Sequence, residues 1–335
     1  MLMLDAAETA ALIDRDDLRR VVGVAMAEVS AGRVSMPARV GAFRSAPWGV
    51  MAAMPAHVPA LDAMATKVVN VFPANADRGL PTHQAVVLVV DPDTGGFVAM
   101  LDGDVITAER TAAGSALSTD LLARADSRVL AIIGTGVQAR SHALAVPRVR
   151  AFTQIRIAGR DERKAGALAA EIDLSLDALP GSSRPELVVA ASYEEACVGA
   201  DVVCATTDSP EPVVQREWLS PGSHVTSIGF SAHGPEIDGA TVAASLLVVE
   251  SRATAFAGYP VGPHDLAQPL AAGLIGVDHV AAELGELVLG VANGRASDEQ
   301  LTLYKSAGVA AQDVAAAKLI HDAAVASGAG TYFQR

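Results

Sequence analysis

The sequence predicts an α/β protein that combines a doubly wound parallel sheet with a second, discontinuous α+β domain. The main observation is that short apolar segments alternate with helical patterns from about residue 119 onward. Such alternation is typical of a parallel sheet that helices cover on both faces. The second observation is that the pattern before this region differs and that a helical pattern returns at the end of the chain. The strands of the parallel sheet are expected at 129–133, 155–158, 187–190, 201–205, 224–228 and 246–250.

The region before the parallel sheet is predicted to form one amphipathic helix followed by strands. A helical period runs over residues 14–31, and Pro and Gly separate the segments that follow, as in the turn at 93–96. The helical pattern at 310–320 is expected to return to this first domain. The predicted domains are therefore 1–115 together with 308–335, and 116–307. The strands of the first domain are expected at 49–54, 66–72, 85–91 and 96–101.

The composition narrows the class of protein. A chain of 335 residues is long enough for two domains with their own cores. The formal net charge of −13, without clustered basic residues, argues against a nucleic-acid surface. Cys197 and Cys204 cannot build a disulfide framework, which favours a reducing cytoplasm. We expect neither a signal peptide nor a membrane span, because no uncharged run approaches ~20 residues. The eight histidines lack the paired spacing of zinc sites, so no metal is expected.

The segment 129–139 carries the strongest functional motif, an apolar run that passes through a glycine turn into a helix. In such a turn the first glycine permits the bend and the second lets the backbone approach a pyrophosphate. Ala139 takes the place of a third glycine, where the helix packs on the strand. N–H groups at the helix start bind phosphate. The motif predicts a Rossmann-type dinucleotide site formed by Gly134, Thr135, Gly136, Val137, Gln138 and Ala139.

The end of the next predicted strand bears on the choice of dinucleotide. An acidic residue there commonly binds the 2′-hydroxyl of NAD, but this chain has Gly159 followed by Arg160. A glycine leaves room for a 2′-phosphate and a guanidinium pairs with it, while Arg163 and Lys164 add positive charge. NADP, as NADPH, is therefore the expected cofactor. Two alternatives stay open: Arg160 is only a solvated charge, or Asp161, one residue further on, selects NAD.

Three basic residues of the first domain are candidates for binding an anionic substrate. Lys67 lies in a predicted apolar strand, where its charge is costly to desolvate unless an anion compensates it. Arg110 is expected to open the helix before the nucleotide domain, and Arg39 lies shortly after Pro37. Taken singly, each fits a surface ion pair. Taken together, they predict a pocket for a small carboxylate-bearing substrate, since arginine binds carboxylates through paired hydrogen bonds.

These motifs resemble the ornithine cyclodeaminase and mu-crystallin family over nearly the whole chain, and its mu-crystallin branch more closely. The resembling segments are 50–56, 66–73, 81–85, 102–113, 134–139 and 306–308. The resemblance implies a homodimer, in which 1–115 with 308–335 is the substrate-binding and dimerisation domain and 116–307 binds the dinucleotide. It implies that Arg39, Lys67 and Arg110 bind the substrate carboxylate. The implied cofactor contacts are Thr82, Arg110, Gln138, Gly159, Arg160, Thr206, Thr207 and Ser306.

One position departs from the cyclodeaminases of this family. There, an aspartate that acts as acid and base follows a Val-Gly-Gly segment, whereas Ser231 stands at that position here, as a serine does in the mu-crystallin branch. A hydroxyl is a poor general base near neutral pH. The resemblance therefore predicts an NAD(P)H-dependent oxidoreductase, of ketimine reductase or amino acid dehydrogenase type, that reduces a C=N bond alpha to a carboxylate. The expected substrate is a small imine, oxo acid or amino acid.

Two other functions remain as alternatives. A cyclodeaminase-type lyase would use bound NAD without net consumption, and a crystallin-like protein would bind NADPH or another ligand without catalysis. The joint presence of Arg39, Lys67 and Arg110 favours an enzyme. The proton for the imine nitrogen is assigned to Lys67 or to water. His83, His233 and Glu236 are candidate auxiliary acids, or else structural residues.

Overall fold

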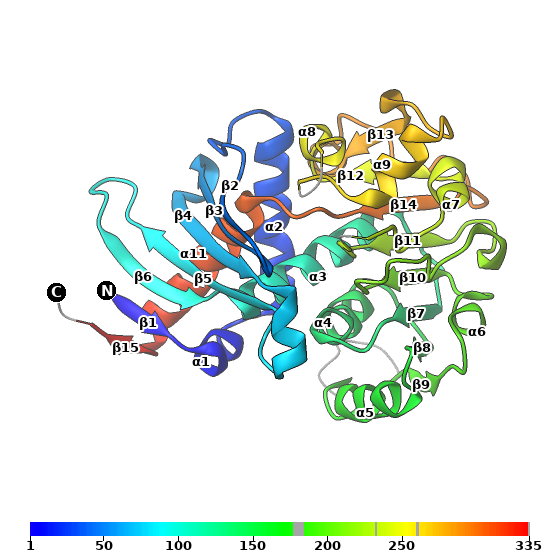
Figure 1. Ribbon diagram of the computed structural model, residues 1–335, viewed down its shortest axis with the longest axis horizontal. Helices are drawn as coiled ribbons and strands as arrows, with labels where there is room; N and C mark the ends of the chain where they lie inside the picture. Colours follow the sequence, from blue (N-terminus) through cyan, green and yellow to red (C-terminus); the bar gives the residue numbers. More distant parts are fainter. Residues whose placement is uncertain (177–183, 232, 259–260, 334–335) are drawn as a thin grey trace. The chain divides into compact units, whose positions relative to one another are not determined.

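The computed structural model describes residues 1–176, 184–231, 233–258 and 261–333 of the chain (Figure 1). The chain forms two compact units. Unit 1 comprises Met1–Arg110 and Val309–Arg335, and unit 2 comprises Thr111–Gly308. Unit 1 is thus built from both ends of the chain. Among the described residues, no helix is long and apolar enough to cross a membrane.

Unit 1 is built on a seven-stranded sheet with the strand order β15-β1-β6-β5-β4-β3-β2. Neighbouring strands run antiparallel except for the parallel pair β1 and β6. The helices are α1 (Ala6–Ala11), α2 (Arg15–Ser30) and α11 (Ala310–Ser327), and α3 (Gly103–Leu122) begins in this unit. The strands are β1 (Leu2–Leu4), β2 (Val40–Ser45), β3 (Trp48–Val58), β4 (Ala63–Val71), β5 (His83–Val90), β6 (Phe97–Asp102) and β15 (Thr331–Tyr332).

The two faces of this sheet differ in what covers them. Helix α11 packs against α2 and against β3, β4 and β5. Alternate residues of β4, including Ala65, Lys67 and Val69, are buried on the covered face. Ala310–Ala317 of α11 is buried along its whole length and consists mostly of alanine, whose small side chain lets helix and sheet approach closely. The opposite face keeps apolar side chains exposed, among them Met51 and Val86.

Unit 2 is a parallel sheet with the strand order β13-β12-β14-β11-β10-β7-β8-β9. Separate apolar clusters, one around Ile133 and Val203 and one around Ile132 and Ile155, bury its two faces. The predicted doubly wound α/β class is therefore confirmed. The strands are β7 (Val129–Ile133), β8 (Gln154–Ala158), β9 (Glu186–Val189), β10 (Val202–Ala205), β11 (His224–Ser227), β12 (Leu246–Val249), β13 (Val280–Glu283) and β14 (Thr302–Lys305).

The order of strands in unit 2 reverses between β7 and β10. From β7 the chain proceeds outward through β8 and β9, and it then returns to β10 on the other side of β7. In open α/β sheets, ligands bind at the carboxyl ends of the strands beside such a reversal. The helices that connect the strands are α4 (Val137–Ala145), α5 (Glu162–Asp173), α6 (Tyr193–Cys197), α7 (Gly239–Ala244), α8 (Arg252–Ala255), α9 (His264–Ala271) and α10 (Leu284–Val288).

Two strands of this sheet, β13 and β14, were not predicted from the sequence. Strand β14 inserts between β11 and β12, and β13 extends the edge beyond β12. Both have only four residues, and β14 ends in Tyr304 and Lys305, which are fully buried. A buried lysine interrupts the apolar run by which such a strand is recognised, so only its tertiary partners account for its position.

Candidate active site

The glycine turn after β7 has the geometry that a dinucleotide requires. Gly134 has φ +126°, and a Cβ on it would lie 2.6 Å from Oγ1 of Thr206 and 2.9 Å from the Thr206 carbonyl oxygen. At Gly136 an added Cβ would meet no described atom within 4 Å. Gly136 is the cap of α4, so the N–H groups of the first helical turn have no side-chain cap there. Oε1 of Gln138 is buried without a hydrogen-bond partner among the described residues. The glycine turn and the uncapped helix start fit a bound pyrophosphate.

The loop after β8 carries the cation Arg160, and the neighbouring acid Asp161 is already hydrogen-bonded within the protein. Asp161 is the N-cap of α5, where its Oδ1 accepts hydrogen bonds from the N–H groups of Arg163 (2.9 Å) and Lys164 (3.3 Å). Arg160 is exposed. Partial burial raises the pKa of Tyr193, and the nearby Arg160 charge acts against that shift. Gly159 has a packing reason of its own, since a Cβ there would lie 2.5 Å from Cγ2 of Thr135.

In unit 1, Lys67 and Arg110 meet at a buried carboxylate. Nζ of Lys67 lies 2.9 Å from Oδ2 of Asp313, and Nε of Arg110 lies 2.9 Å from Oδ1 of the same residue. Arg110 also donates through NH1 to Oε1 of Gln312 at 3.0 Å, and Nζ of Lys67 lies 3.4 Å from Oγ1 of Thr107. The anion that compensates Lys67 therefore belongs to the protein. The sequence led us to expect this anion from a carboxylate-bearing substrate and did not indicate Asp313.

Burial and neighbouring charges shift the ionisation of this cluster. Burial lowers the pKa of Lys67 to about 8, the Asp313 charge opposes this shift, and the Arg110 and Arg39 charges add to it. Burial alone would raise the pKa of Asp313, but the cations Lys67 and Arg110 hold it below its usual range. Arg39 is thus close enough for its charge to act on Lys67. The cluster contains more cations than anions, as a site for one further carboxylate requires.

The sequence placed Arg110 at the start of a helix, and the structure corrects this. Helix α3 begins at Gly103, so Arg110 lies two turns inside it and faces α11 through Gln312 and Asp313. The N–H of Val105 donates to Oδ1 of Asp102 at 2.8 Å, which caps the start of the helix. The side chain of Arg110 is nevertheless buried in the cluster with Lys67, as a shared role requires.

The other predicted residues lie at strand ends within their own units. Thr82 is exposed and precedes β5, and Nδ1 of His83 lies 2.6 Å from Oδ1 of Asp104. In unit 2, Thr206 and Thr207 follow β10, and Ser306 follows β14. The oxygen of Ser231, in the loop after β11, accepts the N–H of His233 at 3.1 Å. The parallel sheet therefore brings Thr206, Thr207, Ser231, Ser306 and the glycine turn to one edge.

Two residues that hold predicted site residues in place, Glu250 and Asp313, were not identified from the sequence. Glu250 accepts the Ser306 hydroxyl at 2.6 Å and the N–H groups of Ala307 and Gly308 at 2.7 and 3.0 Å, so it fixes the predicted cofactor contact. Asp313 also went unnoticed, although a local signal existed. Gln312 and Asp313 are the only polar residues between 309 and 317, and a polar pair in an apolar helix needs buried partners.

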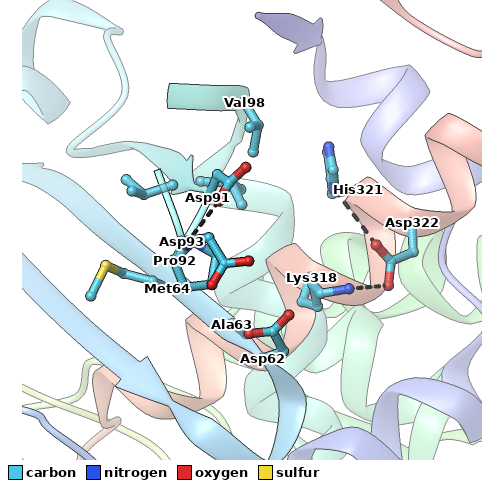
Figure 2. A pocket seen from close by; sticks show the side chains of 12 residues that line it. Asp62, Ala63, Met64, Asp91, Pro92, Asp93, Val98, Lys318, His321 and Asp322 are labelled. Carbon is cyan, nitrogen blue, oxygen red and sulfur yellow. Dashed lines mark hydrogen bonds and ion pairs between the residues drawn. The ribbon is translucent and has the colours of Figure 1, made fainter. Parts of the chain in front are cut away.

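Unit 1 also contains a pocket of about 220 Å³ away from the basic cluster (Figure 2). Its lining includes Asp62, Asp91 and Asp93, together with Lys318, whose Nζ lies 2.6 Å from Oδ2 of Asp322. The acidic residues outnumber the cation, so this pocket does not suit a carboxylate. Among the described residues, no group of three or more His, Cys, Asp or Glu side chains is arranged to hold a metal ion.

Comparison with known proteins identifies the family. The model of the ornithine cyclodeaminase/mu-crystallin family matches residues 1–328. The chain belongs to this family. The ketimine reductase mu-crystallin of Mus musculus is 35% identical over 292 residues, which are 87% of this chain and 86% of the mouse protein.

Solved structures of similar proteins have the same fold over nearly their full length. The Δ1-pyrroline-2-carboxylate reductase of Thermococcus litoralis, in complex with NADH and L-proline, is 34% identical, with a TM-score of 0.92 and coverage of 99% of this chain and 100% of that chain. An archaeal alanine dehydrogenase dimer with bound NAD is 32% identical, with a TM-score of 0.88 and coverage of 100% and 99%. The prediction of an NAD(P)H-dependent oxidoreductase that reduces a C=N bond alpha to a carboxylate is confirmed.

Proposed function

We propose that this chain is an NADPH-dependent ketimine reductase for small cyclic imines alpha to a carboxylate, with reductive amination of an oxo acid as a related activity. The observation that carries the proposal is the buried cluster of Lys67, Arg110 and Asp313, in which cations outnumber the anion. Support for the substrate class comes from similar proteins described as a ketimine reductase and a pyrroline-2-carboxylate reductase.

Arg39, Lys67 and Arg110 are the proposed binding groups for the substrate carboxylate. Arg110 uses Nε and NH1 within the cluster, and no described contact engages its NH2 group. A guanidinium oriented in this way binds a further carboxylate without losing its own partners. Because Asp313 fixes Lys67 and Arg110 before substrate arrives, little side-chain freedom is lost on binding. Ser231 is proposed as a hydrogen-bonding partner of the substrate.

Lys67 is the proposed proton donor. The cofactor, when bound, supplies the hydride that the imine carbon accepts. The imine nitrogen takes a proton from Nζ of Lys67, so that the C=N bond becomes the C–N single bond of an amine, and water then returns a proton to Lys67. With a pKa of about 8, Lys67 is protonated near neutral pH and is a stronger acid than an ordinary lysine. No aspartate at position 231 is needed for this chemistry.

The proposed preference for NADPH rests on the end of β8. Asp161, the residue that would favour NAD, already caps α5 through its Oδ1. Arg160 is exposed beside Tyr193, where a 2′-phosphate of the cofactor is expected. Thr82, Gln138, Thr206, Thr207 and Ser306 are proposed as further cofactor contacts, and Arg110 as a residue that touches both cofactor and substrate.

The test of this proposal follows reduced nicotinamide absorbance with NADPH or NADH and a panel of cyclic ketimine acids and oxo acids. Imine-dependent loss of NADPH is the expected result. Ornithine, assayed for ammonia, is the control for the lyase alternative. Release of ammonia from ornithine without net cofactor loss would replace the reductase with a cyclodeaminase, and binding of NADPH without turnover on any imine would favour the non-catalytic alternative.

Arg160→Ser is expected to raise KM for NADPH by about 10- to 100-fold while changing KM for NADH little, because only NADPH loses a charge-assisted contact. Steady-state kinetics with both cofactors measures the ratio. Arg156→Ser provides the control, since Arg156 lies within β8, before Arg160, and donates to the carbonyl of Val198 at 2.6 Å. An equal change in both KM values for Arg160→Ser would contradict the role of Arg160.

We further propose a homodimer formed through the uncovered face of the seven-stranded sheet. Met51 of β3 and Val86 of β5 lie on this face and are 51% and 39% exposed. Exposed apolar side chains on one face of a sheet are typical of an interface. The similar archaeal alanine dehydrogenase is a dimer. Val86→Asp is expected to shift the mass in sedimentation equilibrium from two chains toward one; a wild-type monomer at micromolar concentration would refute the dimer.

A further inference from the structure

Unit 2 contains a second buried ionic cluster that the proposed reaction does not use. The side chains of Glu236, Asp265 and Lys305 are each at most 3% exposed. Nζ of Lys305 lies 3.0 Å from Oδ2 of Asp265 and 4.0 Å from Oε1 of Glu236. Desolvating three charged groups offsets much of their mutual attraction, so a cluster of this kind contributes little net stability compared with apolar packing. Its presence therefore calls for another explanation.

The cluster ties together the carboxyl ends of three strands. Oε2 of Glu236 accepts both the N–H and the hydroxyl of Thr207, at 2.9 and 3.0 Å, after β10. Oε1 accepts the Ser227 hydroxyl at 2.8 Å and the N–H of Gly229, at the end of β11. Lys305, the last residue of β14, donates to Ser227 Oγ at 2.9 Å and to the Gly229 carbonyl at 2.7 Å. Every hydrogen-bonding direction of the Glu236 carboxylate is thus filled by a donor.

The backbone approaches this carboxylate so closely that only glycine fits. A Cβ on Gly229 would lie 2.4 Å from Cδ of Glu236 and 2.4 Å from the Thr207 carbonyl oxygen. A second close approach joins the same two loops, because a Cβ on Gly234 would lie 2.1 Å from the Pro210 carbonyl oxygen. The loops after β10 and β11 therefore pack closely against one another at two points.

These two loops follow β10 and β11, which lie on the opposite side of β7 from β8 and β9. Strand β7 and its turn belong to the first mononucleotide-binding half of such a sheet, and β10 and β11 belong to the second half. The second half takes the nicotinamide end of a dinucleotide. Thr207 and Ser231, which the loops carry, are among the proposed site residues.

We propose that Glu236 and Lys305 are positioning residues for the nicotinamide half of the cofactor. They hold the peptide groups of Thr207 and Gly229 in a fixed relation and thereby set the loop that carries Ser231. Glu236 is therefore not an auxiliary acid, because its oxygens are buried and occupied. Burial raises its pKa, and the charge of Lys305 acts against that shift. The inference rests on the proposed function, because it assumes that a nicotinamide dinucleotide binds at this edge.

The test compares NADPH with 2′-phospho-ADP-ribose, a fragment that lacks the nicotinamide. Glu236→Gln places an amide N–H₂ against the donors of Thr207 or Gly229, and Lys305→Met removes the charge that bridges Ser227 and Asp265. For both variants we expect Kd for NADPH to rise about tenfold, with Kd for the fragment unchanged within about twofold. Titration calorimetry measures both constants without any need for turnover. The proposed reaction itself is tested by a different measurement, the imine assay on wild-type protein, so its failure is distinguishable from a failure of the positioning role.

A matched control lies at the opposite edge of the same sheet. Asp201 accepts the N–H groups of Arg128 and Val129 at 2.7 and 2.9 Å, so Asp201→Asn makes the same chemical change among backbone donors. Both affinities are expected to stay at the wild-type value in this variant. If Glu236→Gln does not fold, Ser227→Ala removes only the hydroxyl that links Lys305 with Glu236 and gives a smaller shift of the same kind. Equal losses for NADPH and the fragment, or no loss for either, would overturn the positioning role.

Discussion

Lys67→Met is expected to lower kcat for imine reduction by about 10³-fold while leaving the affinity for NADPH unchanged. The substitution keeps a chain of similar length in the buried position but removes both the proton and the charge next to Asp313. Substrate affinity falls as well, because one of the three cations of the carboxylate site is lost. Loss of reduced-nicotinamide absorbance under single-turnover conditions measures the chemical step directly.

The pH profile and a second variant separate the two roles of Lys67. In wild-type protein kcat is expected to fall as the pH rises through about 8, since the deprotonated amine has no proton to give. Lys67→Arg keeps the charge but not the acidity, so it should retain KM within a few-fold and lose kcat. Lys318→Met is the matched control, a lysine paired with an aspartate on α11 at the acidic pocket. Turnover of Lys67→Met within about tenfold of wild type would exclude Lys67 as the acid.

Asp313→Asn is expected to destabilise the protein by about 3 kcal/mol, because it leaves Lys67 and Arg110 buried without their shared anion. It should also move the alkaline limb of the kcat profile to lower pH. The sign follows from the electrostatics: the Asp313 charge opposes the lowering of the Lys67 pKa, so its removal lets that pKa fall further. Urea unfolding measures the first effect and initial rates across pH measure the second.

The control for Asp313→Asn is a second aspartate of the same helix, α11. Asp322→Asn removes an exposed carboxylate that pairs with Lys318, and it should leave both the urea midpoint and the pH profile where they are. An alkaline limb that stays in place in Asp313→Asn, in protein shown to be folded, would mean that the group titrating in wild type is not Lys67.

Local sequence patterns were sufficient to predict the parts of the fold in which a continuous apolar run is buried. Strands β7, β8 and β10, with helix α11, follow periods that depend only on neighbouring residues. Strand β2 gave no such signal because all of its side chains are exposed. Strand β14 was missed for the opposite reason, since it buries a lysine whose partners come from distant segments. Periodicity cannot indicate a charge that tertiary contacts compensate.

The candidate site likewise has one part that could be predicted from local sequence and one part that could not. The glycine turn from Gly134 to Gly136 is encoded within a few residues, so its geometry was predictable. The basic cluster was predictable only in part. The cost of burying Lys67 correctly indicated a nearby anion, but Asp313 lies 203 residues beyond Arg110 in the sequence. No local spacing joins residues so far apart, so from the sequence the anion was expected to come from the substrate.

The return of α11 to the first sheet has a consequence for how the chain is made. Lys67 is synthesised first, and its anion Asp313 follows only after the whole of unit 2 has been made. Until then the nascent first unit has an uncompensated lysine and lacks the helix that covers β3, β4 and β5. The contiguous unit Thr111–Gly308 is under no such constraint. We therefore expect Thr111–Gly308 to complete its fold first and the first unit to close only once α11 has been made, so that chains truncated before α11 would fail at this step.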